Sequence, residues 1–171
     1  MTGYSFSDQK EQIFAMENFE IRHLQDEIRV DELCQRLLHR FRQDLVENEK
    51  LQAAQAGALA HGADYFLREF VIPDRRENIF ALRPGRVRQF AGNWYIVRNL
   101  EPNMRELANI LKGIEAFYDW CFRVGKVSVE LVETVRQECS QLDYYRQRIE
   151  DFWAIEGDGY LAWERECTLK E

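Results

Sequence analysis

Residues 101–125 read EPNMRELANILKGIEAFYDWCFRVG, and this stretch decides the fold class of the chain. Its apolar residues recur at intervals of three and four, which is the period of one face of an amphipathic helix. These residues are Leu107, Ile110, Leu111, Ile114, Phe117, Tyr118 and Cys121. Pro102 suits the start of a helix and Gly125 its end. The stretch therefore predicts a long helix with one buried face.

Three further helices are predicted after this one. Ser128 is an N-cap for the first, and Ser140–Asp143 resembles a capping box that opens the second, with Asp in place of the usual Glu. Gly157 and Gly159 then break the chain before a short helix around Trp163. The C-terminal part of the chain is thus expected to be helical throughout.

Helical spacing also continues toward the N-terminus. Ser7-Asp8 predicts a helix start, with the helix running to about Leu24, and Asp31 predicts a second cap. The second helix is expected to continue into the Ala-rich residues 51–60, where Gly57 or Gly62 ends or bends it. Apolar residues then repeat from 59 to 71, and Pro73 stops the pattern.

Residues 75–100 allow two interpretations. Val87, Phe90, Ala91, Trp94 and Val97 fit one helical face, with Pro84 in the first turn. The segments 78–82 and 93–97 are also rich in residues that favour strands, and Pro84-Gly85 can turn a hairpin. We prefer the helix and keep the hairpin as the alternative.

The composition supports an all-α fold. Of 171 residues, 46% are hydrophobic and 13% aromatic, while only nine are Gly and three are Pro. This is enough apolar surface for a core, with few helix breakers. We therefore predict one all-α domain over 1–171, a multi-helix bundle with an N-terminal helical extension at 1–58 and a core with further helices at 59–171.

The charge is uneven along the chain. The net charge is −7, but residues 83–105 hold five arginines and one acidic residue, Glu101. The arginines are Arg83, Arg86, Arg88, Arg98 and Arg105, interleaved with Trp94 and Tyr95. Guanidinium groups beside aromatic rings can hold phosphates and stack on bases, so these five are candidate nucleic-acid-binding residues. The alternative is that Trp94 is core and the arginines pair with acidic neighbours.

No motif for catalysis, metal binding or a cofactor is found. Glu20 and His23 have the spacing of half a di-iron site, but the second Glu-x-x-His is missing, so both are expected on a solvated helix face. Nucleophile elbows, zinc motifs and phosphate loops are absent. Cys34, Cys121, Cys139 and Cys167 form no C-x-x-C pair and are expected as reduced, packed thiols. We expect no enzyme, no metal and no cofactor.

The location of the protein is also predicted from what the sequence lacks. The chain begins without a basic-then-apolar signal pattern, and no apolar run reaches membrane-spanning length. We therefore expect a cytoplasmic protein that does not enter a membrane.

Residues 82–131 resemble part of a known helical domain. Arg83–Phe90 reads RPGRVRQF, and residues 101–126 begin with Glu-Pro and end with FYDWCFRVGK. Both elements are similar to the second half of the SAM-like core-binding domain of phage integrases and tyrosine recombinases, and residues 64–70 are similar to its first helix. The resemblance implies a helical DNA clamp. The acidic helices that follow Ser128 leave no room for a recombinase catalytic domain.

Two functions remain in consideration. The acidic balance and the many amphipathic faces favour a protein–protein interaction or regulatory module, with an unknown partner or self-association. The alternative is a DNA-binding accessory protein that uses the five arginines. An enzyme with an unfamiliar site has no residue to support it.

Overall fold

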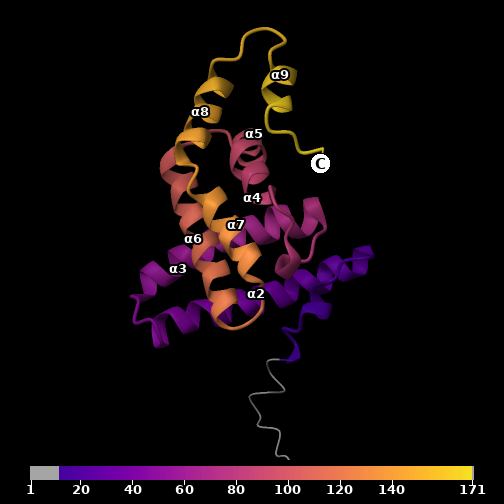
Figure 1. The fold of residues 1–171 in the computed structure, drawn as a ribbon, viewed down its shortest axis with the longest axis vertical. Helices are drawn as coiled ribbons and strands as arrows, with labels where there is room; N and C mark the ends of the chain where they lie inside the picture. The colour runs from indigo at the N-terminus through magenta and orange to yellow at the C-terminus, as the bar shows by residue number, and fades with distance from the viewer. Residues whose placement is uncertain (1–11, 171) are drawn as a thin grey trace, which may run out of the picture.

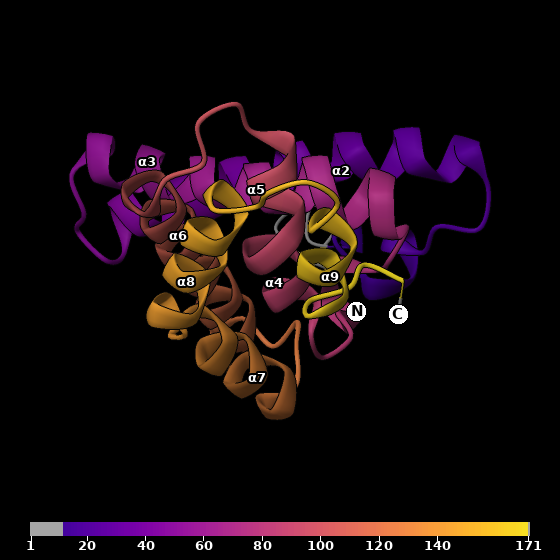
Figure 2. The same ribbon diagram turned by 90° about the horizontal axis from the view of Figure 1, so that it is seen from above.

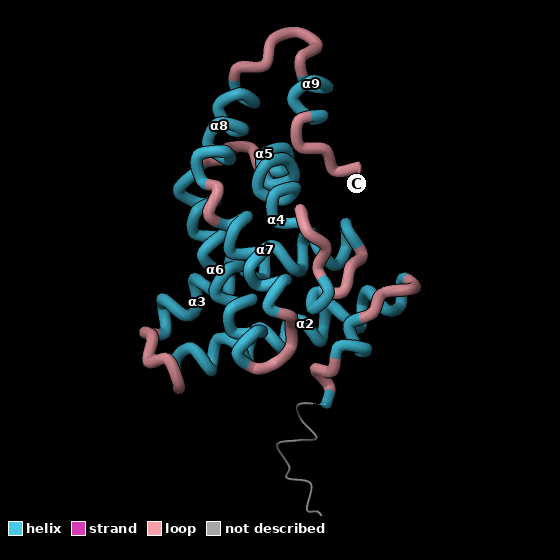
Figure 3. Tube along the Cα trace, viewed as in Figure 1, coloured by secondary structure: helices cyan, strands magenta, loops and turns pink. Residues whose placement is uncertain are grey.

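The computed structural model of the chain describes residues 12–170. Within that range every regular element is a helix (Figure 3), so the predicted all-α fold is confirmed there. The elements are η1 (Met16–Phe19), α2 (Leu24–Glu47), α3 (Ala53–Asp64), η2 (Tyr65–Arg75), η3 (Ile79–Ala81), α4 (Arg86–Gln89), η4 (Phe90–Trp94), α5 (Tyr95–Arg98), α6 (Met104–Arg123), α7 (Val129–Cys139), α8 (Leu142–Trp153) and α9 (Tyr160–Arg165). None of these helices is both long and apolar enough to cross a membrane.

The helices form two layers around one core. One layer contains α2, α3 and η2, and the other contains α6, α7 and α8. α2 and the continuous α3–η2 helix lie side by side and run across α6 (Figures 1 and 2). α7 and α8 pack beside α6, and the helix formed by α4, η4 and α5 lies between the layers and the C-terminal segment. Buried side chains from α2 through α9 belong to a single hydrophobic cluster. The boundary predicted at residue 58 falls inside α3, and α2 contributes to the same core as the rest.

The start of the chain differs from the sequence prediction. Ser7-Asp8 lies outside the described residues. Within residues 13–23 the helix predicted to reach Leu24 is wrong, because that part of the chain forms turns and the short 3-10 helix η1. α2 begins after His23, where the Asp26 carboxylate accepts hydrogen bonds from the backbone N–H groups of Arg22 (2.9 Å) and His23 (3.0 Å). These bonds to the charged form lower the pKa of Asp26.

The cap predicted at Asp31 is also wrong. Asp31 lies inside α2. Its carboxylate binds the Arg68 guanidinium of η2 at 2.9 Å, so the charge links two helices instead of ending one.

The predicted continuation of this helix into residues 51–60 is wrong as well. α2 ends at Glu47, and Lys50 takes a left-handed conformation (φ 61°) that turns the chain into α3. Neither Gly57 nor Gly62 ends α3. Gly62 and Gly113 instead allow α3 and α6 to touch, because a Cβ on Gly113 would lie 2.4 Å from the Leu59 carbonyl oxygen.

The helix preferred for residues 86–98 is confirmed. α4, η4 and α5 form one continuous helix whose middle turn, η4, is π-helical. Residues 78–82 are not a strand: η3 is a short 3-10 turn, capped by the Asn78 side chain, which accepts a hydrogen bond from Phe80 N–H (2.9 Å).

The caps of the C-terminal half are confirmed in part. α6 covers the predicted stretch, with Asn103 as its N-cap and Gly125 (φ 76°) just after its end. Ser128 caps α7, because its Oγ accepts a hydrogen bond from Leu131 N–H (3.1 Å). The capping box at Ser140–Asp143 is wrong: Ser140 Oγ donates to the Gln137 carbonyl (2.7 Å), and Asp143 pairs with Arg146.

Candidate functional site

The structure divides the five predicted arginines into two groups. Arg83, Arg86 and Arg88 lie at the start of the helix 86–98, whereas Arg98 lies at its end and Arg105 in the first turns of α6. At a rise of 1.5 Å per residue, Arg86 and Arg98 are about 18 Å apart along the helix axis. The five side chains therefore do not form one continuous basic patch.

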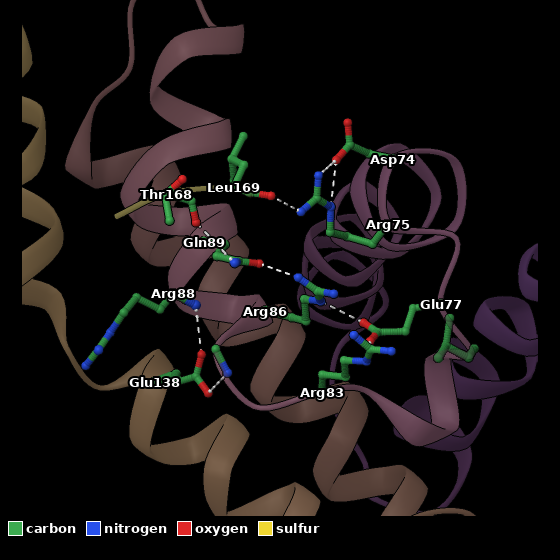
Figure 4. Close-up of polar contacts among 12 residues, drawn as sticks. Asp74, Arg75, Glu77, Arg83, Arg86, Arg88, Gln89, Glu138, Thr168 and Leu169 are labelled. Atoms are coloured by element: carbon green, nitrogen blue, oxygen red, sulfur yellow. Dashed lines mark hydrogen bonds and ion pairs between the residues drawn. The ribbon is translucent and has the colours of Figure 1, made fainter. Parts of the chain in front are cut away.

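Arg86 is a buried structural residue. It is 8% exposed, its Nε donates to Glu77 Oε2 (2.9 Å) and its Nη1 to Gln89 Oε1 (2.7 Å). Arg83 binds the other oxygen of Glu77 at 3.2 Å from the solvent side, with 74% of its side chain exposed. Figure 4 shows both guanidinium groups converging on Glu77. For Arg83 and Arg86 the geometry is therefore that of the alternative interpretation, in which the arginines pair with an acidic neighbour.

Arg88 is held at the surface by α7 and α8. Its guanidinium donates to Gln141 Oε1 (2.9 Å) and lies 5.4 Å from the centre of the Tyr144 ring. Below it, the buried Glu138 carboxylate accepts from the backbone N–H groups of Gly85 (3.0 Å) and Arg88 (2.9 Å). A carboxylate from α7 thus caps the helix 86–98, where the helix dipole favours negative charge.

The remaining two arginines are exposed. Arg98 lies over the Trp94 ring, with its Cζ 5.4 Å from the ring centre. Arg105 lines a separate groove between α3 and α6. Trp94 and Tyr95, proposed as partners of the arginines, are both buried, so neither presents a ring face for a base to stack on.

A groove of about 530 Å³ brings the first three arginines together with a fourth. Arg83, Arg86 and Arg88 line one side, and Arg165 of α9 lines the other together with Glu166. Sequence reasoning missed Arg165, because it lies 77 residues beyond Arg88 and only the folding back of α9 brings it there. Four arginines and one carboxylate line the groove, which is therefore basic.

Backbone contacts hold the C-terminal segment against this groove. Gln89 Nε2 donates to the Thr168 carbonyl (3.1 Å), Asn93 Nδ2 to the Cys167 carbonyl (2.7 Å) and Arg75 Nη1 to the Leu169 carbonyl (2.6 Å). Two of these contacts are visible in Figure 4. Side chains of η2 and of the helix 86–98 therefore hold residues 167–169 in place at the edge of the groove.

A second surface feature lies where α8 and α9 meet. Trp153, Tyr160 and Leu161 are 59%, 41% and 62% exposed, although all three are large and apolar. The connection between α8 and α9 forms one end of the molecule (Figure 1). We call these three side chains the α8–α9 apolar patch.

Acidic residues flank this patch in the sequence. Glu150, Asp151, Glu156 and Asp158 are all exposed. No Lys, Arg or His occurs between Arg148 and Arg165. The patch therefore combines an apolar centre with a negative rim, and the sequence pattern did not distinguish it from core.

The candidate nucleophiles lie inside the protein. Cys34, Cys121, Cys139 and Cys167 are free and buried, and burial raises the pKa of each thiol. Tyr145 is fully buried and its hydroxyl donates to the Glu138 carbonyl (2.6 Å). Such groups are protonated and inaccessible, so they serve packing.

The histidines do not gather into a site with acidic or thiol groups. Glu20 accepts a hydrogen bond from Asn78 Nδ2 (3.0 Å) and His23 caps α2, so the half di-iron spacing is used for structure. In residues 12–170 no group of three or more His, Cys, Asp or Glu side chains is arranged to hold a metal ion.

Comparisons with protein-family models, with curated proteins and with solved structures found no match. The resemblance of residues 82–131 to the integrase core-binding domain stays a prediction. The two surfaces described above are therefore the features of this chain that bear on its function.

Proposed function

We propose that this chain is a non-enzymatic protein-interaction module that binds a protein partner through the α8–α9 apolar patch. The observation that carries the proposal is the exposure of Trp153, Tyr160 and Leu161 together at one end of the molecule. Aromatic and large aliphatic side chains at such positions are typical anchors of protein interfaces.

The rim of the patch defines the chemistry of the partner. Four exposed carboxylates and no basic residue flank the apolar centre between residues 149 and 164. An apolar surface bordered by Lys or Arg complements this arrangement, because opposite charges guide association and like charges oppose it. The partner is accordingly a basic, amphipathic surface or helix.

The same rim argues against self-association through this patch. In a two-fold dimer each patch meets its own copy, so Glu150, Asp151, Glu156 and Asp158 would face the same four carboxylates. Repulsion between these groups opposes such a dimer unless salt screens it. We expect a monomer at low salt, where this repulsion is least screened, and light scattering measures this directly.

The proposal is tested with one disruptive variant and one matched control. Leu161→Asp introduces a charge at the centre of the patch, and Leu24→Asp makes the same change at the start of α2, where Leu24 is 65% exposed. Both proteins and the wild type are immobilised at equal density and exposed to extract of the native cells. A partner that is lost at least about tenfold with Leu161→Asp and kept with Leu24→Asp supports the proposal.

Two results contradict it. The first is a set of captured proteins that does not differ between Leu161→Asp and Leu24→Asp while both variants remain helical by circular dichroism. The second is a captured partner whose contact region, mapped by cross-linking, is acidic or lies away from α8 and α9.

A second candidate function is DNA binding through the arginine groove. The observation that favours it is the meeting of Arg83, Arg88 and Arg165 around one groove. The buried pairing of Arg86 and the net charge of −7 weigh against it, because phosphates are repelled over most of the surface. This candidate therefore ranks below protein interaction.

A gel-shift titration separates the two candidates. If the groove holds phosphates, a duplex shifts at low salt, binding weakens as salt rises, and Arg88→Glu with Arg165→Glu removes the shift. Arg36→Glu, an exposed change on α2 outside the groove, is the control. No shift at low salt rules out the DNA function.

A further inference from the structure

A groove of about 770 Å³ lies between α3, α6 and the loop that precedes α6. Its volume is in the range of sites for small organic ligands. Its lining includes Leu59, His61, Tyr65, Arg105, Ile110 and Lys112. The groove is separate from both the arginine groove and the α8–α9 apolar patch.

Basic side chains border this groove on two helices. His61 comes from α3, and Arg105 and Lys112 come from α6, seven residues or two turns apart on one face. All three are exposed, and none forms a hydrogen bond or ion pair with another residue of the described part of the chain. The charges of Arg105 and Lys112 are therefore available to a ligand, unlike that of Arg86.

The acidic residue in the lining, Glu106, forms a hydrogen bond within the protein. Glu106 Oε1 accepts a hydrogen bond from the Tyr95 hydroxyl (2.9 Å), and its backbone N–H is bound by the Asn103 cap. The groove thus combines two cationic side chains, Arg105 and Lys112, with one carboxylate that is hydrogen-bonded to the protein. This balance favours an anionic ligand.

The groove also has an apolar side. Ala58, Leu59 and Ile110 line it where α3 and α6 touch. Gly62 permits this close contact, because a Cβ there would lie 2.9 Å from the Ile110 carbonyl oxygen. The Tyr65 hydroxyl accepts a hydrogen bond from Asn99 Nδ2 (3.0 Å), which leaves its own proton free to donate. A ligand with both an apolar ring and anionic groups matches this lining.

We propose that this groove binds a small organic phosphate of nucleotide size. The phosphates contact Arg105 and Lys112, and the apolar part of the ligand lies against Leu59 and Ile110. Charges two turns apart suit a ligand with more than one phosphate, such as a nucleoside di- or triphosphate. The site is independent of the proposed protein interaction, because it shares no residue with the α8–α9 apolar patch.

The test uses ATP as the probe, in magnesium-free buffer with 100 mM salt, with binding followed by calorimetry and by NMR. We expect saturable binding that perturbs the side-chain amides of Gln55 and Asn109. Arg105→Gln and Lys112→Gln each weaken it about tenfold, which corresponds to the loss of one charge-assisted contact. Arg36→Gln removes the same charge from an exposed position of α2 outside the groove and leaves the affinity unchanged.

Comparison ligands define the chemical class. Adenosine lacks the phosphates and citrate lacks the ring, so both are expected to bind at least tenfold more weakly than ATP. The proposal is overturned by the absence of saturable ATP binding, by citrate binding as tightly as ATP, or by equal weakening with Arg36→Gln. Perturbations confined to Arg88 and Arg165 also overturn it, because they place the ligand in the arginine groove.

Discussion

Arg148 and Trp163 hold each other in the interior through three contacts. The Arg148 guanidinium lies 3.9 Å from the centre of the Trp163 ring, its Nη1 donates to the Trp163 carbonyl (2.6 Å), and the indole Nε1 donates to the Arg148 carbonyl (3.0 Å). Arg148 Nε donates to the carbonyl of Gly92 in the π-helical turn η4 (2.8 Å). One buried arginine thus joins α8, α9 and the helix 86–98.

Arg148→Met is expected to lower the free energy of unfolding by about 3 kcal/mol, because the carbonyl groups of Gly92 and Trp163 lose their donor in the interior. Urea denaturation measures the change. Glu166→Gln is the control: Glu166 lies 3.6 Å from Arg148 but is 68% exposed, so its removal costs less than about 1 kcal/mol. Equal losses in the two variants would contradict the buried role of Arg148.

Gly113→Ala is expected to destabilise the protein by about 1–3 kcal/mol, because the added methyl meets the Leu59 carbonyl oxygen and forces α3 and α6 apart. Gly57→Ala is the matched control in α3. A Cβ there meets only the Arg42 side chain at 3.4 Å, so the helix propensity of Ala raises stability by up to about 1 kcal/mol. Thermal unfolding of both variants gives opposite signs if the helix contact is as described.

Glu77→Ala is expected to cost about 3 kcal/mol, because it leaves the guanidinium of Arg86 buried without its carboxylate. Arg83 binds the same carboxylate from the surface, so Arg83→Ala costs less than about 0.5 kcal/mol. Chemical denaturation of the two variants compares the buried and the exposed member of this cluster. A larger loss for Arg83→Ala would be inconsistent with the pairing.

Alkaline pH is expected to unfold the protein through its thiols. Burial raises the pKa of Cys34, Cys121 and Cys139 above their ordinary value of 9.0, so the folded state keeps protons that the unfolded state loses. The stabilisation is fully present below pH 9 and is lost as pH rises above it. Each thiol contributes about 1.4 kcal/mol per pH unit.

Urea unfolding between pH 8 and 10.5 measures this dependence. Cys34→Ala should reduce the fall in the free energy of unfolding per pH unit by the contribution of one thiol. In the native state at pH 8 all four cysteines should react slowly with a thiol reagent, and rapidly in denaturant. Fast native labelling would show that the thiols are accessible.

Local patterns in the sequence predicted much of the fold. The apolar stripe of α6, the Ser128 cap and the helix over 86–98 each depend on residues within a few turns of one another, and the structure has all three. The errors arose where distant residues decide the outcome. Asp31 has the side chain of a cap, but Arg68, 37 residues away, binds it inside α2.

The candidate sites were predictable only in part. The arginines were identified by type, but their separation follows from the length of the helix 86–98 and from the position of Glu77. Neither Arg165 in the arginine groove nor His61 beside Arg105 had a signal in the sequence, because packing of α9 and α3 brings them there. Arg86 is buried and Arg105 is exposed, and this difference cannot be predicted from their spacing in the sequence.

The π-helical turn η4 constrains the number of residues in the helix 86–98. Each residue of an α-helix advances the chain by about 100° around its axis, so insertion of one residue next to Phe90–Trp94 rotates everything after it by about that angle. Tyr95, whose hydroxyl reaches Glu106, would turn out of the core, and Gly92 would no longer present its carbonyl to Arg148. All five residues of this turn are buried, so a change in their number would disturb the core on every side, and any natural relative with this core should preserve the residue count between Arg86 and Asn99.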